Sequence, residues 1–234
     1  MASIIVIPTY NEKESIAILL EKIFNSVPDI YVMVVDDSSP DGTAAVIKKM
    51  RMKFPNLLLL ERPEKQGLGK AYVAAFKKIL SGEKFENIIM MDGDLSHNPE
   101  TLLPMIEQAK NCDLVIGSRY IKGGEITKKW NFFRRLLSRG ANIYLGMILG
   151  KQIKDWTTGY NLIKTNVLKR IDLDLLSPKG YAFIFSLKYY LLKNNAQIKE
   201  IPIFFDERSN GKSKMTSNII SEAILMPWKL IFRK

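Results

Sequence analysis

Apolar and polar positions form two alternating patterns along the first half of the chain. Short, continuous apolar runs have the length and content of strands that are buried on both faces. These expected strands are residues 3–7, 31–35, 56–60, 87–91 and 113–116. Helical periodicity separates them, over residues 11–26, 41–54 and 67–80 and again from residue 98. Strands that alternate with helices predict an α/β domain, with a mostly parallel sheet and helices on both faces.

Two of the expected helices begin with capping patterns. Asn11, with Glu14 three residues later, has the spacing of a capping box. Asn98 precedes Pro99, which suits the first turn of a helix. Both patterns predict that a helix begins directly after the asparagine.

The second half is less regular. We expect loops over residues 122–129 and 207–214, a short strand over 159–163 and a strand-like stretch over 197–205. Helical patterns cover residues 130–149, 182–193 and 217–232, the last with a kink at Pro227. No repeat or clear linker interrupts the chain. We therefore expect one α/β domain over residues 1–214 and an apolar C-terminal helix over residues 215–234.

The C-terminal pattern allows two interpretations. Its many apolar positions stand beside Lys229, Arg233 and Lys234, which is typical of an amphipathic helix at a membrane surface. A helix that docks on the protein core has the same pattern. No apolar run reaches the roughly 20 residues that cross a bilayer.

Charge and cysteine content narrow the class of protein. The 234 residues carry a formal net charge of +11, concentrated in residues 119–140 and 208–234. Such clustering indicates anionic partners, such as phosphorylated ligands, an anionic membrane or nucleic acid, although solvated helix faces also look like this. A single cysteine, Cys112, excludes a disulfide-stapled secreted scaffold.

Polar residues follow four of the expected strands at the point where each strand ends. In open α/β sheets ligands bind at the carboxyl ends of the strands, so these clusters are candidate site residues. The clusters are residues 8–12, 36–43, 92–97 and 117–120. Each alone could be a turn with a helix cap, but together they bring five aspartates to one edge.

Asp92 and Asp94 carry the most chemistry. Two carboxylates separated by Gly93 would repel each other at close range. A divalent cation removes that repulsion, and carboxylate oxygens favour Mg²⁺ or Mn²⁺. We therefore expect a magnesium or manganese site here, completed by water and substrate phosphates.

Other phosphate-binding and catalytic patterns are missing. Neither the glycine-rich dinucleotide fingerprint nor the P-loop pattern is complete anywhere in the sequence. The only histidine, His97, excludes a histidine metal cluster. We interpret it as a capping or packing residue, or as an outer contact to phosphate.

Seven motifs in order resemble those of family 2 glycosyltransferases with the GT-A fold, in particular the dolichol-phosphate mannosyltransferases and their polyprenol-phosphate relatives. Five lie in the first half: Pro8-Thr9-Tyr10-Asn11-Glu12, Asp36-Asp37-Ser38 with Asp41-Gly42-Thr43, Gly67-Leu68-Gly69 with Ala71, Asp92-x-Asp94-Leu95-x-His97, and Gly117-Ser118-Arg119-Tyr120. Two follow: Asp155-x-Thr157-x-Gly159-Tyr160 and Arg208-x-x-Gly211-x-Ser213-Lys214. The resemblance covers almost the whole chain and implies a single GT-A, Rossmann-like catalytic domain.

The resemblance implies a role for each group of site residues. The donor nucleotide would be held by Pro8, Tyr10, Glu12, Asp36, Asp37, Asp92, Gly93, Asp94, Arg208 and Lys214, with Ser213 on the same loop. The metal would be bound by Asp92 and Asp94. The acceptor phosphate would be bound by Arg119, Arg134 and Ser138. The catalytic set would be Asp94, Arg119, Arg134 and Asp155, with Asp155 as a group that binds a sugar hydroxyl or positions the substrate, or as a structural group.

The resemblance also implies a reaction and its partners. A hexose, most simply mannose from GDP-mannose, would pass with inversion to a polyprenyl or dolichyl monophosphate. The metal and arginines would neutralise the leaving diphosphate. A phosphate oxygen is already anionic near neutral pH, so no general base is needed. The implied place is the cytoplasmic face of a membrane, with the membrane surface and a membrane-anchoring subunit as partners and nucleic acid excluded.

Three positions depart from the family pattern. Ser96 stands where the family often has a glutamine that can help to bind the metal. Ile184 and Ser186 stand where it often has glutamine and glutamate. We expect these changes to alter the metal site and the pocket near the sugar.

Three alternative functions remain open. One is a glucosyltransferase that uses UDP-glucose. Another is a family 2 transferase with a hydroxyl acceptor, which would need Asp155 or Asp206 as a base. The third is a module that binds an anionic membrane or nucleic acid, although it would leave the aspartates unexplained.

Overall fold

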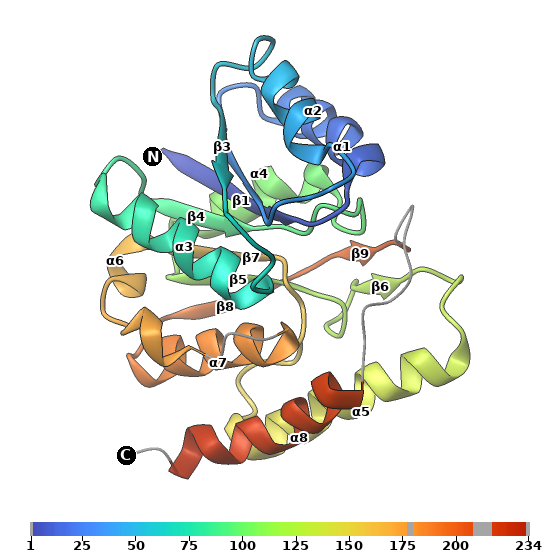
Figure 1. Cartoon of the computed structure of the whole chain (residues 1–234). Coiled ribbons are helices and arrows are strands. Elements are labelled where there is room, and N and C mark those ends of the chain that lie inside the picture. Colours follow the sequence, from blue (N-terminus) through green and yellow to red (C-terminus); the bar gives the residue numbers. More distant parts are fainter. Residues whose placement is uncertain (1, 177–179, 208–216, 233–234) are drawn as a thin grey trace.

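The computed structural model describes residues 2–176, 180–207 and 217–232. The apolar runs predicted in the first half form strands of one seven-stranded sheet, in the order β3-β2-β1-β4-β7-β5-β8 (Figure 1). These strands are β1 (Ser3–Thr9), β2 (Tyr31–Asp36), β3 (Leu57–Glu61), β4 (Asn87–Met90), β5 (Leu114–Ser118), β7 (Asn161–Lys164) and β8 (Ile198–Pro202). Two short parallel strands, β6 (Glu125–Ile126) and β9 (Phe204–Phe205), form a second sheet.

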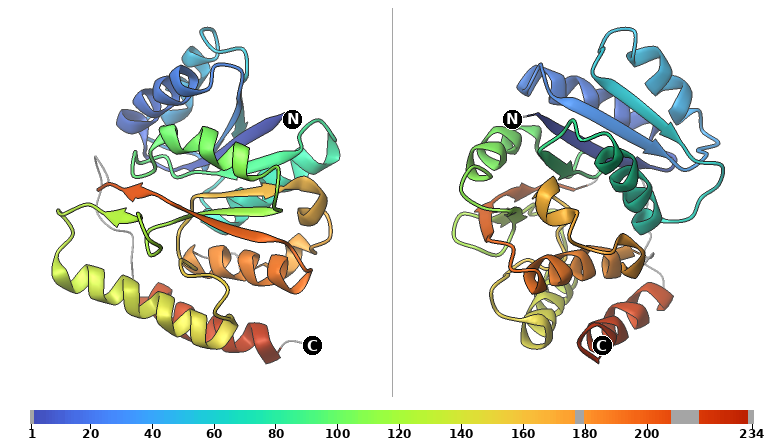
Figure 2. Two further views of the ribbon diagram at one scale, coloured as in Figure 1. Left: turned by 180° about the vertical axis from the view of Figure 1, so that it is seen from behind. Right: turned by 90° about the vertical axis from the view of Figure 1, so that its left-hand side faces the viewer.

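Helices cover both faces of the large sheet, as predicted (Figure 2). The helices are α1 (Lys13–Ser26), α2 (Thr43–Met50), α3 (Leu68–Ser81), α4 (Leu102–Gln108), α5 (Phe132–Leu149), α6 (Thr165–Leu168), α7 (Gly180–Lys193) and α8 (Ser217–Phe232). Short 3₁₀ turns at Pro99–Thr101 and Leu173–Leu175 complete the described elements.

The two-residue period of the central strands builds a separate core on each face. In β1, Ile4 and Val6 pack with α3 and α7, whereas Ile5 and Ile7 pack with α1 and α4. All four side chains are fully buried. A strand that is apolar on both faces is what a sheet between two helical layers requires.

The topology places the loop after β1 beside the loop after β4. The chain leaves β1 toward β2 and β3 on one side, and β4 lies on the other side of β1. This reversal of strand order is the switch point at which open α/β sheets bind ligands. Residues 8–12 and 92–97 therefore meet at one crevice.

The sheet departs from the prediction at β7. The sequence predicts a short strand near residues 159–163, and the structure inserts it antiparallel between β4 and β5. The strand-like stretch over 197–205 divides into β8 and β9 at Ile203. Pairing partners and direction depend on long-range contacts, which local periodicity does not encode.

Asn11 does not cap α1, contrary to the predicted capping box. The helix starts at Lys13, and Asn11 takes a left-handed conformation with φ 60°. The Oδ2 atom of Asp41 accepts the Lys13 backbone N–H, and Thr43 Oγ1 accepts that of Glu12. The cap thus comes from the loop after β2. The prediction for Asn98 is confirmed, because its side chain accepts the backbone N–H of Glu100.

Helices α5 and α8 lie side by side along one end of the molecule (Figures 1 and 2). The Tyr144 hydroxyl donates to the Ile224 carbonyl oxygen at 2.7 Å and accepts the Trp228 Nε1–H at 2.9 Å. Leu230 is buried, and α8 continues through Pro227. The predicted boundary between residues 214 and 215 lies outside the described residues. Among those described, no helix is both long and apolar enough to span a bilayer.

Candidate active site

The loops after β1 and β2 are joined at the crevice. Thr9 and Asp36 pair in register, and the Thr9 hydroxyl donates to Asp36 Oδ1 at 2.9 Å. The Asp37 backbone N–H donates to the Thr9 carbonyl oxygen at 3.1 Å. Pro8, Tyr10 and their neighbours are thereby held against residues 36 and 37.

Asp92 is held in place by His97, which contacts the Asp92 backbone and lies near its carboxylate. The Asp92 backbone N–H donates to His97 Nδ1 at 3.0 Å, so the proton of the neutral ring is on Nε2. That nitrogen lies 3.9 Å from Asp92 Oδ2. The ring is buried between Tyr160, on which it stacks, and the edge of Phe205. His97 is therefore a packing residue that orients Asp92, one of the two roles the sequence predicts.

Asp94 is oriented by Ser96. The Ser96 backbone N–H and hydroxyl both donate to Asp94 Oδ1, at 3.1 and 2.5 Å. Leu95 between them takes a left-handed conformation, with φ 67°. Ser96 thus supports the Asp94 carboxylate from one side.

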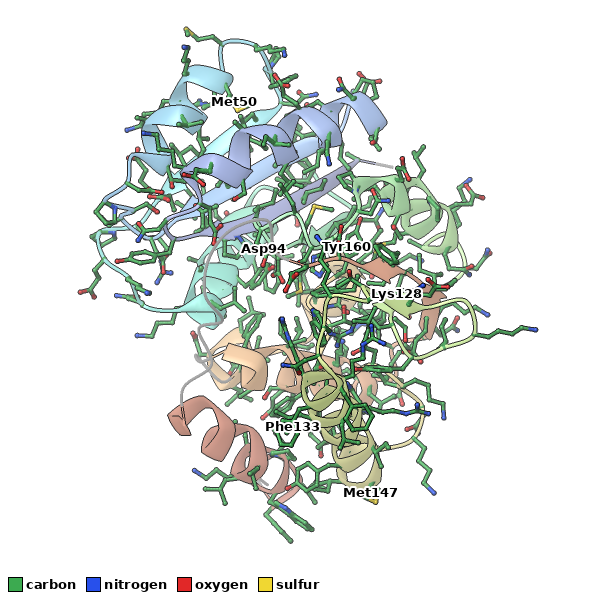
Figure 3. All side chains as sticks on the ribbon, turned by 90° about the vertical axis from the view of Figure 1, so that its right-hand side faces the viewer. Met50, Asp94, Lys128, Phe133, Met147 and Tyr160 are labelled. Carbon is green, nitrogen blue, oxygen red and sulfur yellow. The ribbon has the colours of Figure 1, made fainter. Side chains whose placement is uncertain are left out.

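The charges of both Asp92 and Asp94 act on the buried Tyr72 side chain. Burial first, and then the charges of Asp92 and Asp94, raise the pKa of Tyr72. The Tyr72 hydroxyl donates to the Met91 carbonyl oxygen at 3.4 Å. Figure 3 shows Asp94 near Tyr160 in the middle of the molecule.

Asp92 and Asp94, called here the acidic pair, fit a hard divalent cation. The Asp92 side chain keeps 28% of its surface exposed. The described part of the chain gathers no group of three or more His, Cys, Asp or Glu side chains. Two carboxylates match the way magnesium is usually held, with water and substrate phosphates as the other ligands. A methyl group on Gly93 would make ordinary 3.4 Å contacts with Ile7 and Thr9, so protein packing does not by itself require glycine.

Asp36 and Asp37, predicted to hold the donor nucleoside, have different surroundings. Asp36 is almost fully buried and accepts from Thr9 and from the Ser39 backbone and hydroxyl. Asp37 Oδ1 accepts from Arg62 at 2.7 Å, and its Oδ2 accepts from the Gln66 backbone at 3.3 Å. Asp36 shapes its loop, and Asp37 belongs to a buried ion pair.

The other residues predicted to hold the donor border this region. The Tyr10 ring lies under the Lys65 ammonium, 3.7 Å from the ring centroid. Glu12 Oε2 accepts from the Ser15 hydroxyl at 3.1 Å. Pro8 is partly exposed at the end of β1. Arg208, Ser213 and Lys214 lie outside the described residues.

Arg119 forms a bidentate ion pair with Asp155. Its Nε and Nη2 atoms donate to the two Asp155 carboxylate oxygens at 2.7 and 2.8 Å, and its backbone N–H donates at 3.0 Å. Asp155 is fully buried and Arg119 is 7% exposed. Burial of Asp155 opposes ionisation, but the Arg119 charge and hydrogen bonds and the Lys188 charge hold the pKa of Asp155 below its ordinary value. This geometry favours the positioning role predicted for Asp155.

Of the predicted acceptor residues on α5, Ser138 is linked to the residue after Arg119, and Arg134 packs on Trp130. The Tyr120 hydroxyl donates to Ser138 Oγ at 2.7 Å. The Arg134 guanidinium lies 3.8 Å from the Trp130 ring centroid, one turn before Ser138. The side chain of Asn131 caps this helix, where the sequence places its start near residue 130.

A cavity of about 480 Å³ opens beside Arg119, between α5 and the loops after β5 and α5. Its cationic side chains are Arg119, Arg139, Lys151 and Lys154, and its apolar ones include Ile143 and Met147. Among the residues that the structure describes, no acidic side chain lines it. The cavity can therefore accept an anion with an apolar tail.

Sequence reasoning missed several residues that build this site. Arg62 pairs with Asp37, Lys188 lies under residues 155–158, and Asn142 accepts the backbone N–H groups of Trp156 and Thr157. None belongs to a local motif. Asn142 and Lys188 are polar positions inside apolar helical patterns, and this is the signal that could have marked them.

An α/β sheet with polar loops and an acidic pair at its switch point has the arrangement in which this class of fold binds its ligands. The protein-family model described as "Glycosyl transferase family 2" matches residues 4–172 of the sequence. The chain therefore belongs to that family. It is a glycosyltransferase, as the resemblance implied.

Curated relatives match over nearly all of the chain. An undecaprenyl-phosphate mannosyltransferase from Micrococcus luteus is 38% identical over 96% of this chain and 92% of its own length. A polyprenol monophosphomannose synthase from Mycolicibacterium smegmatis is 38% identical over 95% of this chain and 84% of its own length. A dolichol-phosphate mannosyltransferase from Pyrococcus furiosus is 34% identical over 96% of this chain and 64% of its own length.

Solved structures share the fold at low sequence identity. A mannosyltransferase from Pyrobaculum calidifontis, in complex with GDP-Man and Mn²⁺, has a TM-score of 0.68 and 17% identity over 99% of this chain and 64% of its own. A second structure is glucosyl-3-phosphoglycerate synthase from Mycobacterium tuberculosis in complex with Mn²⁺, uridine diphosphate and phosphoglyceric acid. It has a TM-score of 0.73 and 14% identity over 99% of this chain and 78% of its own. The GT-A fold that the resemblance implied is confirmed.

Proposed function

We propose that this glycosyltransferase transfers mannose from GDP-mannose to a polyprenyl monophosphate, with inversion at the anomeric carbon. The proposal is supported by three curated relatives whose names describe mannosyl transfer to polyprenol, undecaprenyl or dolichol phosphate. The observation that carries it is the acidic pair at the switch point, together with the Arg119 cavity, whose cationic and apolar lining can receive a second anion.

The acidic pair would hold Mg²⁺ or Mn²⁺. The exposed edge of Asp92 and the Ser96-supported carboxylate of Asp94 are the candidate ligands. When bound, the metal would supply positive charge to the diphosphate leaving group. The loops after β1 and β2 would hold the nucleoside, with Tyr10 and Asp37 at their borders.

Cationic side chains on the other side would receive the acceptor phosphate. Arg119 presents a narrow exposed edge, fixed by Asp155, and Arg134 and Ser138 lie on α5. A phosphomonoester has a second pKa near ≈ 6, so its oxygen is already a nucleophile at neutral pH. These residues need only orient the phosphate and offset charge in the transition state.

The burial of Asp155 disfavours it as the base for the alternative with a hydroxyl acceptor, which leaves the exposed Asp206 as the other candidate base. That reaction requires a base within reach of the substrate. Asp155 is fully buried, both of its oxygens accept from Arg119, and its lowered pKa makes it a weak base. A phosphate acceptor removes the requirement.

The apolar surface of α5 and α8 supports a membrane-bound acceptor. On α5 the exposed apolar residues are Phe132, Phe133, Leu136, Leu137, Ile143 and Met147; on α8 they are Ile224, Leu225, Trp228, Ile231 and Phe232. Figure 3 shows Phe133 and Met147 at this end of the molecule. Exposed Lys128 and Arg139 add positive charge. The sequence assigned such a surface to the C-terminal helix and missed α5, although paired phenylalanines before paired arginines are a visible signal.

The proposed setting is therefore the cytoplasmic face of a membrane, reached through this surface or with an anchoring subunit. Replacing Phe132 and Phe133 with serine should weaken binding to anionic phospholipid vesicles by roughly 10-fold or more. Met52→Ser, at an exposed residue remote from α5 in the fold, is the control. Equal vesicle binding by the α5 variant and the wild type would contradict this surface.

A matched pair of acceptors tests the reaction itself. The protein is incubated with Mn²⁺ and either GDP-mannose or UDP-glucose, and with a short polyprenyl phosphate or the same polyprenol without phosphate. We expect a lipid-linked product from GDP-mannose and the phosphate alone. A product from UDP-glucose would reassign the donor. A product from the free alcohol, or none from any lipid, would contradict the proposed acceptor.

A further inference from the structure

Lys188 is a charged side chain buried inside α7. It is 1% exposed, and its Nζ donates to the backbone carbonyl oxygens of Asp155, Trp156 and Thr158 at 2.8, 3.3 and 3.0 Å. An ammonium has three N–H donors, and all three find acceptors on this one segment. A buried lysine is retained in a fold only where such partners offset its desolvation.

Residues 155–158 are also held from two other elements. Glu200 on β8 accepts the backbone N–H of Asp155 at 3.0 Å. Asn142 on α5 accepts the backbone N–H groups of Trp156 and Thr157 at 2.7 and 3.2 Å. With Lys188 below, the segment is fixed by side chains from α5, α7 and β8.

The fixed segment carries the two contacts that matter to the proposed site. The Asp155 carboxylate orients the Arg119 guanidinium. At the other end, Gly159 lies so close to Asp92 that an added Cβ would be 3.3 Å from Asp92 Oδ1. Movement of the segment would therefore reach both Arg119 and the acidic pair.

Lys188 also balances the charge of this region. The charged groups that act on it are Asp155 on the segment, Glu200 on β8 and Arg119 after β5. With Lys188 protonated, two carboxylates face two cations. Without Lys188, the Arg119 guanidinium would offset the buried Asp155 carboxylate alone, and the half-buried Glu200, which binds the Asp155 backbone, would lose a nearby cation.

We propose that Lys188 is a positioning residue for glycosyl transfer, which fixes residues 155–159 so that Arg119 and Asp92 keep their places on either side of the reacting groups. This role rests on the proposed function, because the substrates are those of mannosyl transfer. The effect of Lys188 on the positions of Arg119 and Asp92 does not depend on the proposed function. Lys188 touches no substrate, and it acts through the backbone carbonyls it binds.

Three substitutions separate its charge from its hydrogen bonds. Lys188→Met removes both, Lys188→Gln keeps amide donors without the charge, and Lys188→Arg keeps the charge and donors. Lys193→Met removes an exposed lysine at the end of the same helix. Leu191→Ala, at a fully buried position of α7, lowers stability without touching the segment's hydrogen bonds. All are assayed well below their melting temperatures.

We expect kcat to fall in the order wild type, Lys188→Arg, Lys188→Gln, Lys188→Met, with the last down by about 10- to 100-fold. The KM for GDP-mannose should change less than kcat does, because the nucleoside contacts lie elsewhere and the segment reaches the diphosphate only through Asp92. Lys193→Met and Leu191→Ala should keep the wild-type kcat. Crystal structures of the variants should show Arg119 and Asp155 displaced.

The pH profile adds a readout that a merely structural residue would not change. Burial lowers the pKa of Lys188 to about 7, against the opposing charges of Asp155 and Glu200. Wild-type kcat should therefore decline as pH rises through this region, when one of three donors is lost. Lys188→Arg stays charged and should not show that decline.

Two outcomes would overturn the proposal. One is a kcat that follows only the melting temperature, so that Leu191→Ala and Lys188→Gln of equal stability are equally active. The other is an undisplaced Arg119 in Lys188→Gln. If Lys188→Met does not fold, the Gln and Arg variants decide. If the wild type transfers no mannose but the crystal structures show the displacement, the proposed function fails while the positioning role stands.

Discussion

The acidic pair and Asp155 are carboxylates that lie among different side chains. Asp92 keeps 28% of its side-chain surface exposed, whereas Asp94, the other member of the acidic pair at the sheet edge, is buried and accepts from Ser96. Asp155 is fully buried and is neutralised by Arg119, with Lys188 close behind. The comparison teaches that residue type and motif position do not separate a ligand-binding carboxylate from a positioning one. The side chains bound to each carboxylate do: Asp94 accepts from the Ser96 hydroxyl, and Asp155 from the Arg119 guanidinium.

The largest expected effect is at the acidic pair. Asp94→Asn should reduce mannosyl transfer by roughly 10³-fold, because a metal ligand contributes several kcal/mol to charge stabilisation. Binding of GDP, measured by calorimetry, should weaken only when Mn²⁺ is present. Equal weakening after chelation of the metal would show that Asp94 is not a ligand.

The next effect is at the buried aspartate and concerns stability. Asp155→Asn leaves the Arg119 charge without its carboxylate, and should lower the free energy of unfolding in urea by about 3 kcal/mol. The control is Asp174→Asn, which breaks the exposed ion pair with Lys77 and should cost less than about 1 kcal/mol. Similar losses for both variants would mean that burial does not distinguish the two aspartates.

A smaller effect tests the point where the two regions touch. Gly159→Ala places a methyl group 3.3 Å from Asp92 Oδ1 and should weaken Mn²⁺-dependent GDP binding by roughly 10-fold. Gly140→Ala is the matched control, because its methyl group would meet nothing within 4 Å in α5. The control should stabilise the protein by up to about 1 kcal/mol and leave binding unchanged. If Gly159→Ala binds GDP with Mn²⁺ as tightly as the wild type, the segment at residues 155–159 does not influence the acidic pair.

The smallest effect is the pH dependence of the Asp155 contribution. Its folded pKa lies below the ordinary value of 3.8, so its stabilisation is fully present above that value. The stability difference between wild type and Asp155→Asn should shrink as pH falls through the lowered pKa, by at most about 1.36 kcal/mol per pH unit. Urea titrations at acidic pH measure it. A difference that grows as the pH falls would contradict the assigned ion pair.

The sequence predicts the first half of the fold well, because local patterns determine it. Residues 3–7 and 31–35 are apolar on both faces, and only a sheet between two helical layers buries both. The acidic pair was found because it directly follows such a strand. The capping of α1 was mispredicted, since Asp41 and Thr43 compete with Asn11 from another loop.

The second half could not be predicted to the same depth, because its order comes from contacts between distant residues. The direction of β7 depends on β4 and β5, which flank it from far along the chain. Lys188 and Asp155 are more than thirty positions apart, and no spacing rule links them. The resemblance named Asp155 and Arg119 but did not reveal that they bind each other.

The most direct test of the central claim is a crystal structure of the protein with GDP-mannose and Mn²⁺. The account predicts that the ion is coordinated by Asp92 and Asp94 and by the diphosphate, while Asp155 stays paired with Arg119 and touches neither sugar nor metal. An ion bound away from residues 92 and 94, or a direct contact between Asp155 and the sugar, would contradict it.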